Sequence, residues 1–160
     1  MRNRGFEICK GFEDCGVNLP CRSTANSAGY DFECAETVTI PSMWGSDAVK
    51  PVQSTIKPVL VKTGIKAYMA DDEALFIYNR SGNPIKKGLV LANSVGVVDS
   101  DYYSNPDNDG HIMLAFYNFS KQDVVIEKGD RIGQGVFQQY LKVDGDNADA
   151  ERVGGFGSTN

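Results

Sequence analysis

The sequence predicts an all-β protein of one domain. Helical periodicity is almost absent, and short stretches of alternating or β-branched apolar residues recur between turns rich in Gly, Pro, Asn and Asp. The chain has 160 residues, of which 41% are hydrophobic, so it is long enough to bury a core. Many short strands joined by such turns are typical of a β-barrel or β-sandwich.

The strands follow from local patterns. In the longest, Val59, Val61, Thr63, Ile65 and Ala67 alternate and should share one face. One short helix is expected at residues 83–87, where a proline stands in the first turn and a glycine follows the end. The expected strands cover residues 30–34, 37–40, 58–68, 74–78, 111–119, 124–126 and 131–143.

Two segments break the strand pattern. Residues 42–54 include Trp44 and have little periodicity, which predicts a long loop. Residues 142–151 are polar and acidic, which favours a flexible connector, and residues 152–160 form a glycine-rich arm. We therefore expect a β domain over residues 1–141 and a linker with a flexible arm over 142–160. Ten connector residues reach at most ~35 Å, enough to contact a neighbouring subunit.

Composition excludes several classes of function. The net charge is −5 and the pI is about 4.8, so a broad nucleic-acid surface is not expected. No apolar run approaches the ~20 residues that span a membrane, and residues 1–10 show no signal peptide. Four widely spaced cysteines (Cys9, Cys15, Cys21 and Cys34) fit neither a zinc site nor an exported disulfide framework. These features predict a cytoplasmic protein with reduced thiols.

Two glycine-containing segments could hold an anion. In the arm, Arg152, Ser158 and Thr159 surround glycines whose backbone N–H groups can face a phosphate, and Phe156 could stack on a base. Arg80 and its neighbours form a second such turn, at the start of the short helix. A disordered glycine tail and an ordinary turn are the alternatives for these two segments.

Two further segments carry polar groups beside apolar runs. Asp99 ends an apolar run, and a carboxylate at the edge of a core can act as a general base. Tyr102 could pack against a sugar, and Asn93 offers the donor and acceptor needed to read a pyrimidine edge. Residues 128–134 contain a Gly-Asp turn followed by Gln134. Ordinary Asp- and Ser-rich turns would explain both segments without a function.

Taken in order, these segments resemble a known family. Residues 28–31, 80–82, 96–102, 129–134 and 154–159 are similar to the five motifs of the trimeric deoxyuridine triphosphate nucleotidohydrolases (dUTPases). The resemblance runs from about Ser23 to the C-terminus, and the variant form is similar to phage and Gram-positive members. It implies a β-barrel or β-clip fold (a distorted jelly roll) and a homotrimer whose active sites are shared between subunits.

The resemblance also implies a reaction. Water activated by Asp99 would attack the α-phosphorus of dUTP, giving dUMP and pyrophosphate, removing dUTP and supplying dUMP for thymidylate synthesis. Mg²⁺ would be carried mainly by the substrate phosphates, and Asp31 could contact it through water. Uracil and deoxyribose would contact Asn93, Val98, Tyr102 and Phe156, and the phosphates would contact Arg80, Ser81, Gly82, Gln134, Arg152, Gly157, Ser158 and Thr159.

The sequence departs from the family pattern in two places. The arm is one residue shorter between its arginine and its Gly-Phe-Gly, and an insert at residues 104–110 follows Tyr102. The insert is similar to a calcium loop, but Phe116 stands at the twelfth position where a calcium loop has Glu, so we expect no calcium there. His111 follows the insert, and a structural role is expected for it.

Two other functions stay open from the sequence. A dCTP deaminase shares the fold implied by the resemblance, and it would release ammonia rather than pyrophosphate. A binding or regulatory protein that uses nucleotide as a switch ligand would bind an unknown protein partner, with the insert or the 42–54 loop as its contact surface.

Overall fold

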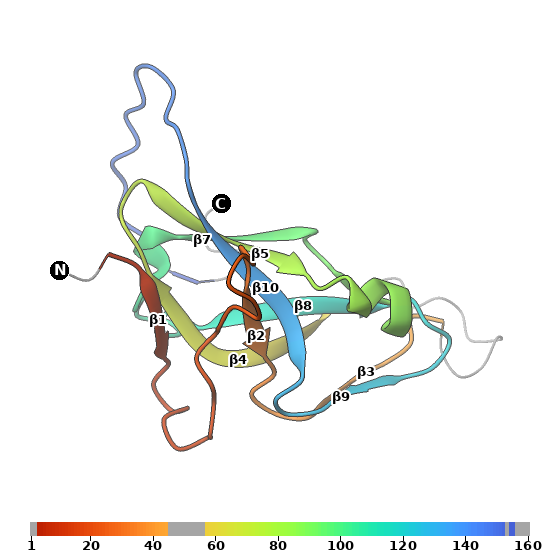
Figure 1. The fold of residues 1–160 in the computed structure, drawn as a ribbon. Helices are drawn as coiled ribbons and strands as arrows, with labels where there is room; N and C mark the ends of the chain where they lie inside the picture. The colour runs from red at the N-terminus through yellow and green to blue at the C-terminus, as the bar shows by residue number, and fades with distance from the viewer. Residues whose placement is uncertain (1–2, 45–56, 153, 156–160) are drawn as a thin grey trace.

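The computed structural model describes residues 3–44, 57–152 and 154–155, and strands dominate these ranges (Figure 1). One short helix, η1, is a single π-type turn over Asn83–Lys87, and another, η2, is a 3₁₀ turn over Ser100–Tyr102. Neither helix is long and apolar enough to cross a membrane. The strands are β1 Gly5–Ile8, β2 Tyr30–Glu33, β3 Val38–Ile40, β4 Val59–Tyr68, β5 Glu73–Asn79, β6 Leu89–Leu91, β7 Val95–Asp99, β8 Ile112–Asn118, β9 Val124–Ile126 and β10 Arg131–Gln139.

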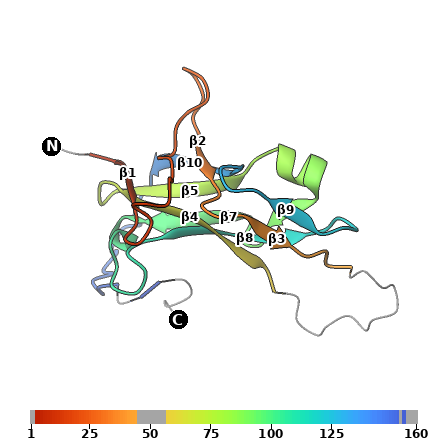
Figure 2. The same ribbon diagram turned by 90° about the horizontal axis from the view of Figure 1, so that it is seen from below.

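The strands form two four-stranded antiparallel sheets and a short ribbon. One sheet has the order β1-β4-β8-β6, and the other has the order β2-β10-β5-β7. The ribbon pairs β3 with β9 at the end of the molecule near η1, and the view from below shows the two sheets as stacked layers (Figure 2). This architecture confirms the all-β prediction.

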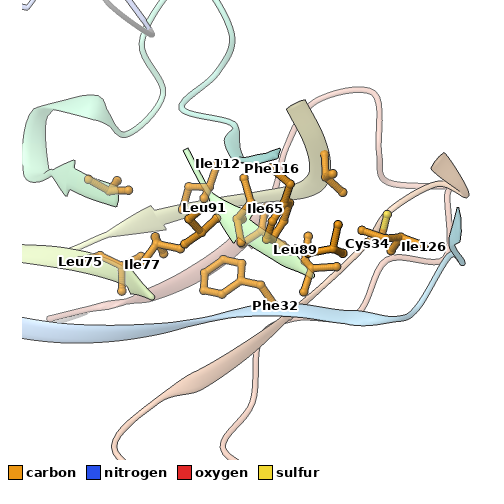
Figure 3. Packing of buried hydrophobic residues seen from close by; sticks show 14 of the residues in the cluster. Phe32, Cys34, Ile65, Leu75, Ile77, Leu89, Leu91, Ile112, Phe116 and Ile126 are labelled. Carbon is orange, nitrogen blue, oxygen red and sulfur yellow. The ribbon is translucent and has the colours of Figure 1, made fainter. Parts of the chain in front are cut away.

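The core lies between the two sheets. β8 alternates in its burial, with residues 112, 114, 116 and 118 buried and those between them half-buried. Figure 3 shows the ring of Phe32 from β2 among Ile65, Leu75 and Leu91, which come from both sheets. Burying each such side chain contributes about 1.5–3 kcal/mol, which makes this layer the main source of stability.

The long strand β4 contains a bulge that changes what its faces contact. Val61, Thr63, Ile65 and Ala67 are buried as predicted, and Val59 is half-buried. The register shifts between Lys62 and Ile65, and Gly64 has φ +70° at that point. β1 pairs with β4 beyond the bulge, over residues 65–68. Both faces are covered there, so even Lys66 is only 8% exposed.

Several expected boundaries differ in the structure. The predicted strand 131–143 ends at Gln139, which pairs with Glu73, the first residue of its partner β5. One further backbone hydrogen bond, from the Tyr140 N–H to the Asp72 carbonyl oxygen at 3.1 Å, follows the strand before the chain leaves the sheet. Strands β1, β6 and β7 were not among the predicted strands. The helix at 83–87 is confirmed, and Gly88 ends it in the left-handed conformation with φ 67°.

The structure describes all of the predicted connector, residues 142–151, but only a small part of the predicted loop, residues 42–54. The connector, residues 142–151, has no helix or strand and is exposed throughout, and it projects from the body in Figure 1. Of the predicted loop 42–54, only residues 42–44 lie in the described part, where the Trp44 indole N–H donates to the Phe119 carbonyl oxygen at 3.0 Å.

Candidate active site

The first cavity lies beside β7 and has a volume of about 240 Å³. Apolar side chains from β5, β6 and β8 line one part of it, while Asn93, Asp99 and Arg152 contribute polar groups. Apolar walls with a few convergent polar groups are typical of a small-molecule site. The lining comprises Ile77, Leu91, Asn93, Gly96, Val97, Val98, Asp99, Tyr102, Ile112, Met113, Leu114, Arg152 and Gly155.

Asn93 reaches this cavity from the tight turn between β6 and β7. Ser94 has φ 59°, and the Val95 N–H donates to the Asn93 carbonyl at 2.6 Å, which closes the turn. The Asn93 side chain therefore presents an amide, with one acceptor oxygen and two N–H donors, at a cavity of mostly apolar walls. An amide placed in this way can distinguish heterocycles by their pattern of donors and acceptors.

Asp99 is the last residue of β7 and pairs with Ala74 of β5. Its side chain is 51% exposed, and its Oδ2 lies 2.5 Å from Nη2 of Arg152. Asp101 accepts a second bond from Nε of Arg152 at 2.7 Å. The hydrogen bond from Arg152 to Asp101 and the two negative charges raise the pKa of the guanidinium. The Asp99 carboxylate is therefore accessible to water and is paired with Arg152, the first residue of the arm.

Tyr102 is held in place from two sides. Its hydroxyl donates to the His111 carbonyl oxygen at 3.0 Å and accepts from Nδ2 of Asn108 at 2.8 Å. Burial raises the pKa of this phenol, and the side chain is 8% exposed. The guanidinium of Arg152 lies 5.7 Å from the ring centroid. The ring is thus a rigid wall of the cavity.

His111 has the structural role that the sequence predicts. Its Nε2 accepts the backbone N–H of Gly64 at 2.9 Å, which holds the bulge of β4 against β8. Phe12 packs on the ring with 4.9 Å between centroids. Burial lowers the pKa of the imidazole to about 4, so the ring is neutral at pH 7 and the acceptor nitrogen is free of a proton.

All four cysteines are free thiols, as expected. Cys9 and Cys34 are buried, and burial raises the pKa of Cys9 to about 12 and also raises that of Cys34. A protonated, buried thiol is a poor nucleophile and a poor metal ligand. These two side chains therefore belong to the packing of the fold and carry no chemistry.

The second cavity is larger, about 820 Å³, and cations line it. Arg80, Ser81 and Gly82 precede η1, and Lys86 and Lys87 belong to its last turn. Such a set of cations, hydroxyls and backbone groups suits a polyanion. The lining comprises Ser23, Ser27, Gly29, Asp31, Arg80, Ser81, Gly82, Asn83, Ile85, Lys86, Lys87, Gly129, Asp130, Arg131 and Gln134.

Asp31 organises the cations of this second cavity. Its Oδ1 lies 3.2 Å from Nε of Arg80, and its Oδ2 lies 3.3 Å from Nη1 of Arg131 and accepts the Ser23 hydroxyl at 2.6 Å. No group of three or more potential metal ligands occurs among the described residues. The cavity has two carboxylates, Asp31 and Asp130, and such a small set suits an ion that keeps most of its waters and is held mainly by a phosphate ligand, as Mg²⁺ commonly is.

The two cavities lie toward opposite ends of the same strand. Asp99 pairs with Ala74 near the start of β5, whereas Arg80 follows Asn79, the end of β5. Six residues of extended strand span about 20 Å. The described residues that line the two cavities form two separate sets. Within one chain, Asp99 and Arg80 therefore face different openings.

The structure divides the predicted site residues into two groups. Asn93, Val98, Asp99, Tyr102 and Arg152 line the first cavity. Asp31, Arg80, Ser81, Gly82 and Gln134 line the second. The residues Phe156, Gly157, Ser158 and Thr159 lie outside the described part of the chain.

Sequence reasoning assigned no role to several residues that the structure brings to these cavities. Asp101 shares Arg152 with Asp99, and its place two residues after Asp99 was the available signal. Arg131 shares Asp31 with Arg80, and its place in the Gly-Asp turn was a weak signal. Ser23, Lys86 and Lys87 gave no signal that separated them from ordinary surface residues.

Fold and cavities together define a class: an all-β protein with one mostly apolar cavity that presents an amide and a carboxylate, and one cavity lined by cations. Comparison with known proteins gives the particular family. The family model described as dUTPase matches residues 16–160. The chain therefore belongs to the dUTPase family, and its activity is that of a deoxyuridine triphosphate nucleotidohydrolase.

Individual relatives agree with this assignment. The chain is 52% identical over 161 residues to the deoxyuridine 5'-triphosphate nucleotidohydrolase of Lactococcus lactis, covering 99% of both chains. The crystal structure of the dUTPase from Streptococcus mutans is 47% identical, with a TM-score of 0.77, and the match covers 88% of this chain and 99% of that one. These matches also confirm the predicted β-clip or jelly-roll class of fold.

A more distant structure shares the fold alone. The dUTPase of phage phi11 of S. aureus has a TM-score of 0.67 at 15% identity, and the match covers 93% of this chain and 98% of that one. A structural Mg(II) ion is described for that protein.

Proposed function

We propose that this dUTPase uses Asp99 to activate the water that attacks the α-phosphorus of dUTP. The water oxygen forms a bond to the α-phosphorus, and the bond from that phosphorus to the bridging oxygen of the β-phosphate breaks. Asp99 accepts the proton from the water, and pyrophosphate leaves with the bond electrons, which yields dUMP. The observation that carries the proposal is a water-accessible carboxylate at a mostly apolar cavity that also presents an amide.

The first cavity supplies recognition of the nucleoside. Asn93 and the backbone around Val98 would pair with the uracil edge, and the fixed ring of Tyr102 would pack under deoxyribose. Because Tyr102 is held by both His111 and Asn108, it has little freedom to yield to a ribose 2′-hydroxyl. Phe156 would cover the base. Close contact between the uracil edge and the backbone around Val98 would leave no room for the thymine methyl group.

The second cavity supplies the phosphate contacts. Arg80, Ser81, Gly82 and Gln134 would bind phosphate oxygens, and Arg152, Gly157, Ser158 and Thr159 of the arm would bind the outer phosphates. Mg²⁺ carried by the triphosphate would neutralise its charge, and Asp31 would contact the ion through water. Asp31 would also keep the guanidinium groups of Arg80 and Arg131 oriented toward the ligand.

These roles require more than one chain at each site. About 20 Å of strand separates Asp99 from Arg80 of the same chain, and a triphosphate is far too short to bridge that distance. One substrate can use both groups only if Asp99 comes from one subunit and Arg80 from another. We therefore propose a homotrimer with shared active sites, in which the enzyme removes dUTP in the cytoplasm and supplies dUMP for thymidylate synthesis.

Arg152 has to change partners during this reaction. Without substrate it neutralises Asp99 and Asp101. The outer phosphates of dUTP carry more charge than either carboxylate, and they would draw the guanidinium away. Asp99 would then have an oxygen free to hold the attacking water. This exchange would couple binding of the triphosphate to activation of the base.

The test is release of pyrophosphate with dUTP, dCTP, dTTP and UTP supplied separately, together with Mg²⁺. We expect release from dUTP alone, and we expect Asp99→Asn to lower turnover about 10²- to 10⁴-fold while dUTP still binds. Full turnover by Asp99→Asn would contradict the role of the base. Formation of ammonia and dUTP from dCTP would instead identify a dCTP deaminase, the alternative that the sequence left open.

A further inference from the structure

The insert, residues 104–110, is a compact and internally bonded loop. Ser104, Asp109 and Gly110 have φ values of 55°, 60° and 76°, so three of its residues are left-handed. The Asn105 side chain accepts the backbone N–H of Asp107 at 3.0 Å and donates to Oδ1 of Asn108 at 2.8 Å. These bonds fix the direction in which the loop presents its carboxylates and amides.

The insert is also tied firmly to the body of the protein. Asp109 pairs with Nζ of Lys66 at 2.9 Å, and both side chains are largely buried. The same carboxylate accepts the backbone N–H of Lys10 at 2.9 Å. Just before the insert, the Tyr103 hydroxyl donates to Glu7 at 2.6 Å. The desolvation of both groups is outweighed by the hydrogen bonds and the opposite charges, since the pKa of Lys66 is raised and that of Asp109 is lowered. The loop is therefore anchored from several sides.

The outer side of this anchored loop contacts the arm. The backbone N–H of Gly155 donates to Oδ2 of Asp107 at 3.1 Å. Gly155 lies so close to Asn108 that an added Cβ would come within 3.2 Å of the amide nitrogen. This contact is separate from the ion pairs of Arg152 with Asp99 and Asp101.

We propose that Asp107 is a positioning residue that holds the arm at the nucleoside cavity through the backbone of Gly155. The inference rests on the proposed function, because it gives the arm a role in substrate binding. Asn108 supports the same contact by packing on Gly155 and by bonding to the hydroxyl of Tyr102. The insert thus links the wall that faces the sugar to the segment that carries Arg152 and Phe156.

The ion pairs of Arg152 and the hydrogen bond of Gly155 respond differently when substrate binds. Phosphate competes with Asp99 and Asp101 for the guanidinium of Arg152, because all three are anions. The N–H of Gly155 is a neutral donor and can stay on Asp107 throughout. A fixed point at Gly155 would keep the arm in place while Arg152 exchanges partners. Less conformational freedom would then be lost on binding, which favours affinity.

The first experiment compares Asp107→Ala, Asp107→Asn and a control, Asp14→Ala, in steady-state dUTP hydrolysis. Asp14 is an exposed carboxylate on the N-terminal loop, so its variant removes the same charge away from the arm. We expect Asp107→Ala to lower kcat/KM about 3- to 10-fold, mostly through KM, since one exposed hydrogen bond to a charged acceptor is lost. Asp107→Asn keeps an acceptor oxygen and should retain most of the activity.

The second experiment separates positioning of the arm from general damage. In a chain ending at Glu151, Asp107→Ala should leave the affinity for the non-hydrolysable analogue α,β-imido-dUTP unchanged, because the segment it holds is gone. In the full-length, ligand-free enzyme, Asp107→Ala should speed cleavage by trypsin after Arg152. Mass spectrometry measures the rate of this cleavage. A merely structural role of Asp107 would weaken binding in the shortened chain as well.

The outcomes distinguish this inference from the proposed function. If wild-type enzyme hydrolyses dUTP but Asp107→Ala matches wild type in KM and in trypsin cleavage, the positioning role is wrong and the function stands. Equal weakening of analogue binding in the full-length and shortened chains would also overturn it. If wild-type enzyme releases no pyrophosphate from dUTP, the proposed reaction itself fails, and the trypsin result still reports on the contact between Asp107 and Gly155.

Discussion

Arg152 and the two carboxylates that it bridges are central at the scale of single residues. A guanidinium bound to Asp99 at 2.5 Å and to Asp101 at 2.7 Å uses its forked donors on two different acids. Lysine could not hold both with the same geometry. The charge of Asp99, the proposed base, is therefore compensated by Arg152, which also keeps this exposed carboxylate in a fixed place.

His111 makes stability depend on pH. The folded protein keeps the imidazole neutral with a pKa of about 4, against an ordinary value of 6.5, so the unfolded chain binds a proton more readily between these values. The neutral His111 therefore contributes to the free energy of unfolding in full above pH 6.5. This contribution is lost as pH falls toward 4, and the loss is roughly 3 kcal/mol at most. Urea unfolding of wild type and His111→Gln across this range measures it.

The glutamine variant is the control for other groups that titrate in acid. Its side-chain oxygen can still accept the N–H of Gly64, but it does not bind a proton in this range. We expect the difference in unfolding free energy between the two proteins to narrow as pH falls from 6.5 to 4. A difference independent of pH would show that His111 is not held neutral by the fold.

At the scale of single elements, the insert at residues 104–110 has a conformation that depends on Gly110. A Cβ at that position would come within 2.7 Å of the Tyr102 carbonyl oxygen and 2.8 Å of the Ser104 nitrogen. The residue also has φ +76°, which L side chains rarely adopt. The loop can close on itself only if this position has no side chain.

Gly110→Ala should therefore destabilise the protein by more than the cost of a positive φ alone. Gly129→Ala is the matched control, because Gly129 has φ +86° but nothing within 4 Å of an added Cβ. We expect the control to cost about 1 kcal/mol and Gly110→Ala to cost about 2–3 kcal/mol or more, measured by denaturant unfolding. Equal losses of unfolding free energy in the two variants would mean that the backbone around Gly110 can shift to accommodate a Cβ at little cost.

Strand signals in the sequence were clearest in β4, which is long and alternates, and short strands such as β2, β3 and β9 also carried enough of a pattern to be predicted. β5 and β8 were predicted from their apolar residues, and β4, β5 and β8 all lie inside the two sheets. β1 has only four residues in a charged segment, and its pairing with residues 65–68 depends on the bulge in β4. β6 has three residues, too few for any periodicity.

The residues proposed for the site could be picked out from the sequence, whereas their arrangement in space could not. Asp99 and Arg80 could be found from the motifs that contain them. Their separation follows from the register of β7 on β5, which no local pattern encodes. The pairing of Arg152 with Asp99 depends on the path of the connector, whose residues are all exposed and have no periodic signal.

At the scale of the whole molecule, a protein with a net charge of −5 binds a polyanion through local clusters of cations. One chain has its cations at one end of β5 and its proposed base at the other. If the substrate needs both groups, the enzyme is active only when its subunits assemble into an oligomer. In the proposed trimer, each site would take Asp99 and the nucleoside cavity from one subunit, and Arg80 with its neighbours from the next.

The measurement that tests this account most directly is complementation between two inactive variants, Asp99→Asn and Arg80→Ala. The purified proteins are unfolded, mixed in equal amounts and refolded together, and pyrophosphate release is compared with that of each variant refolded alone. If sites are shared, about a quarter of the sites in randomly assembled oligomers have both wild-type groups, and the mixture regains about that share of activity. If each site belongs to one chain, the mixture stays as inactive as its parts, and the shared site is contradicted.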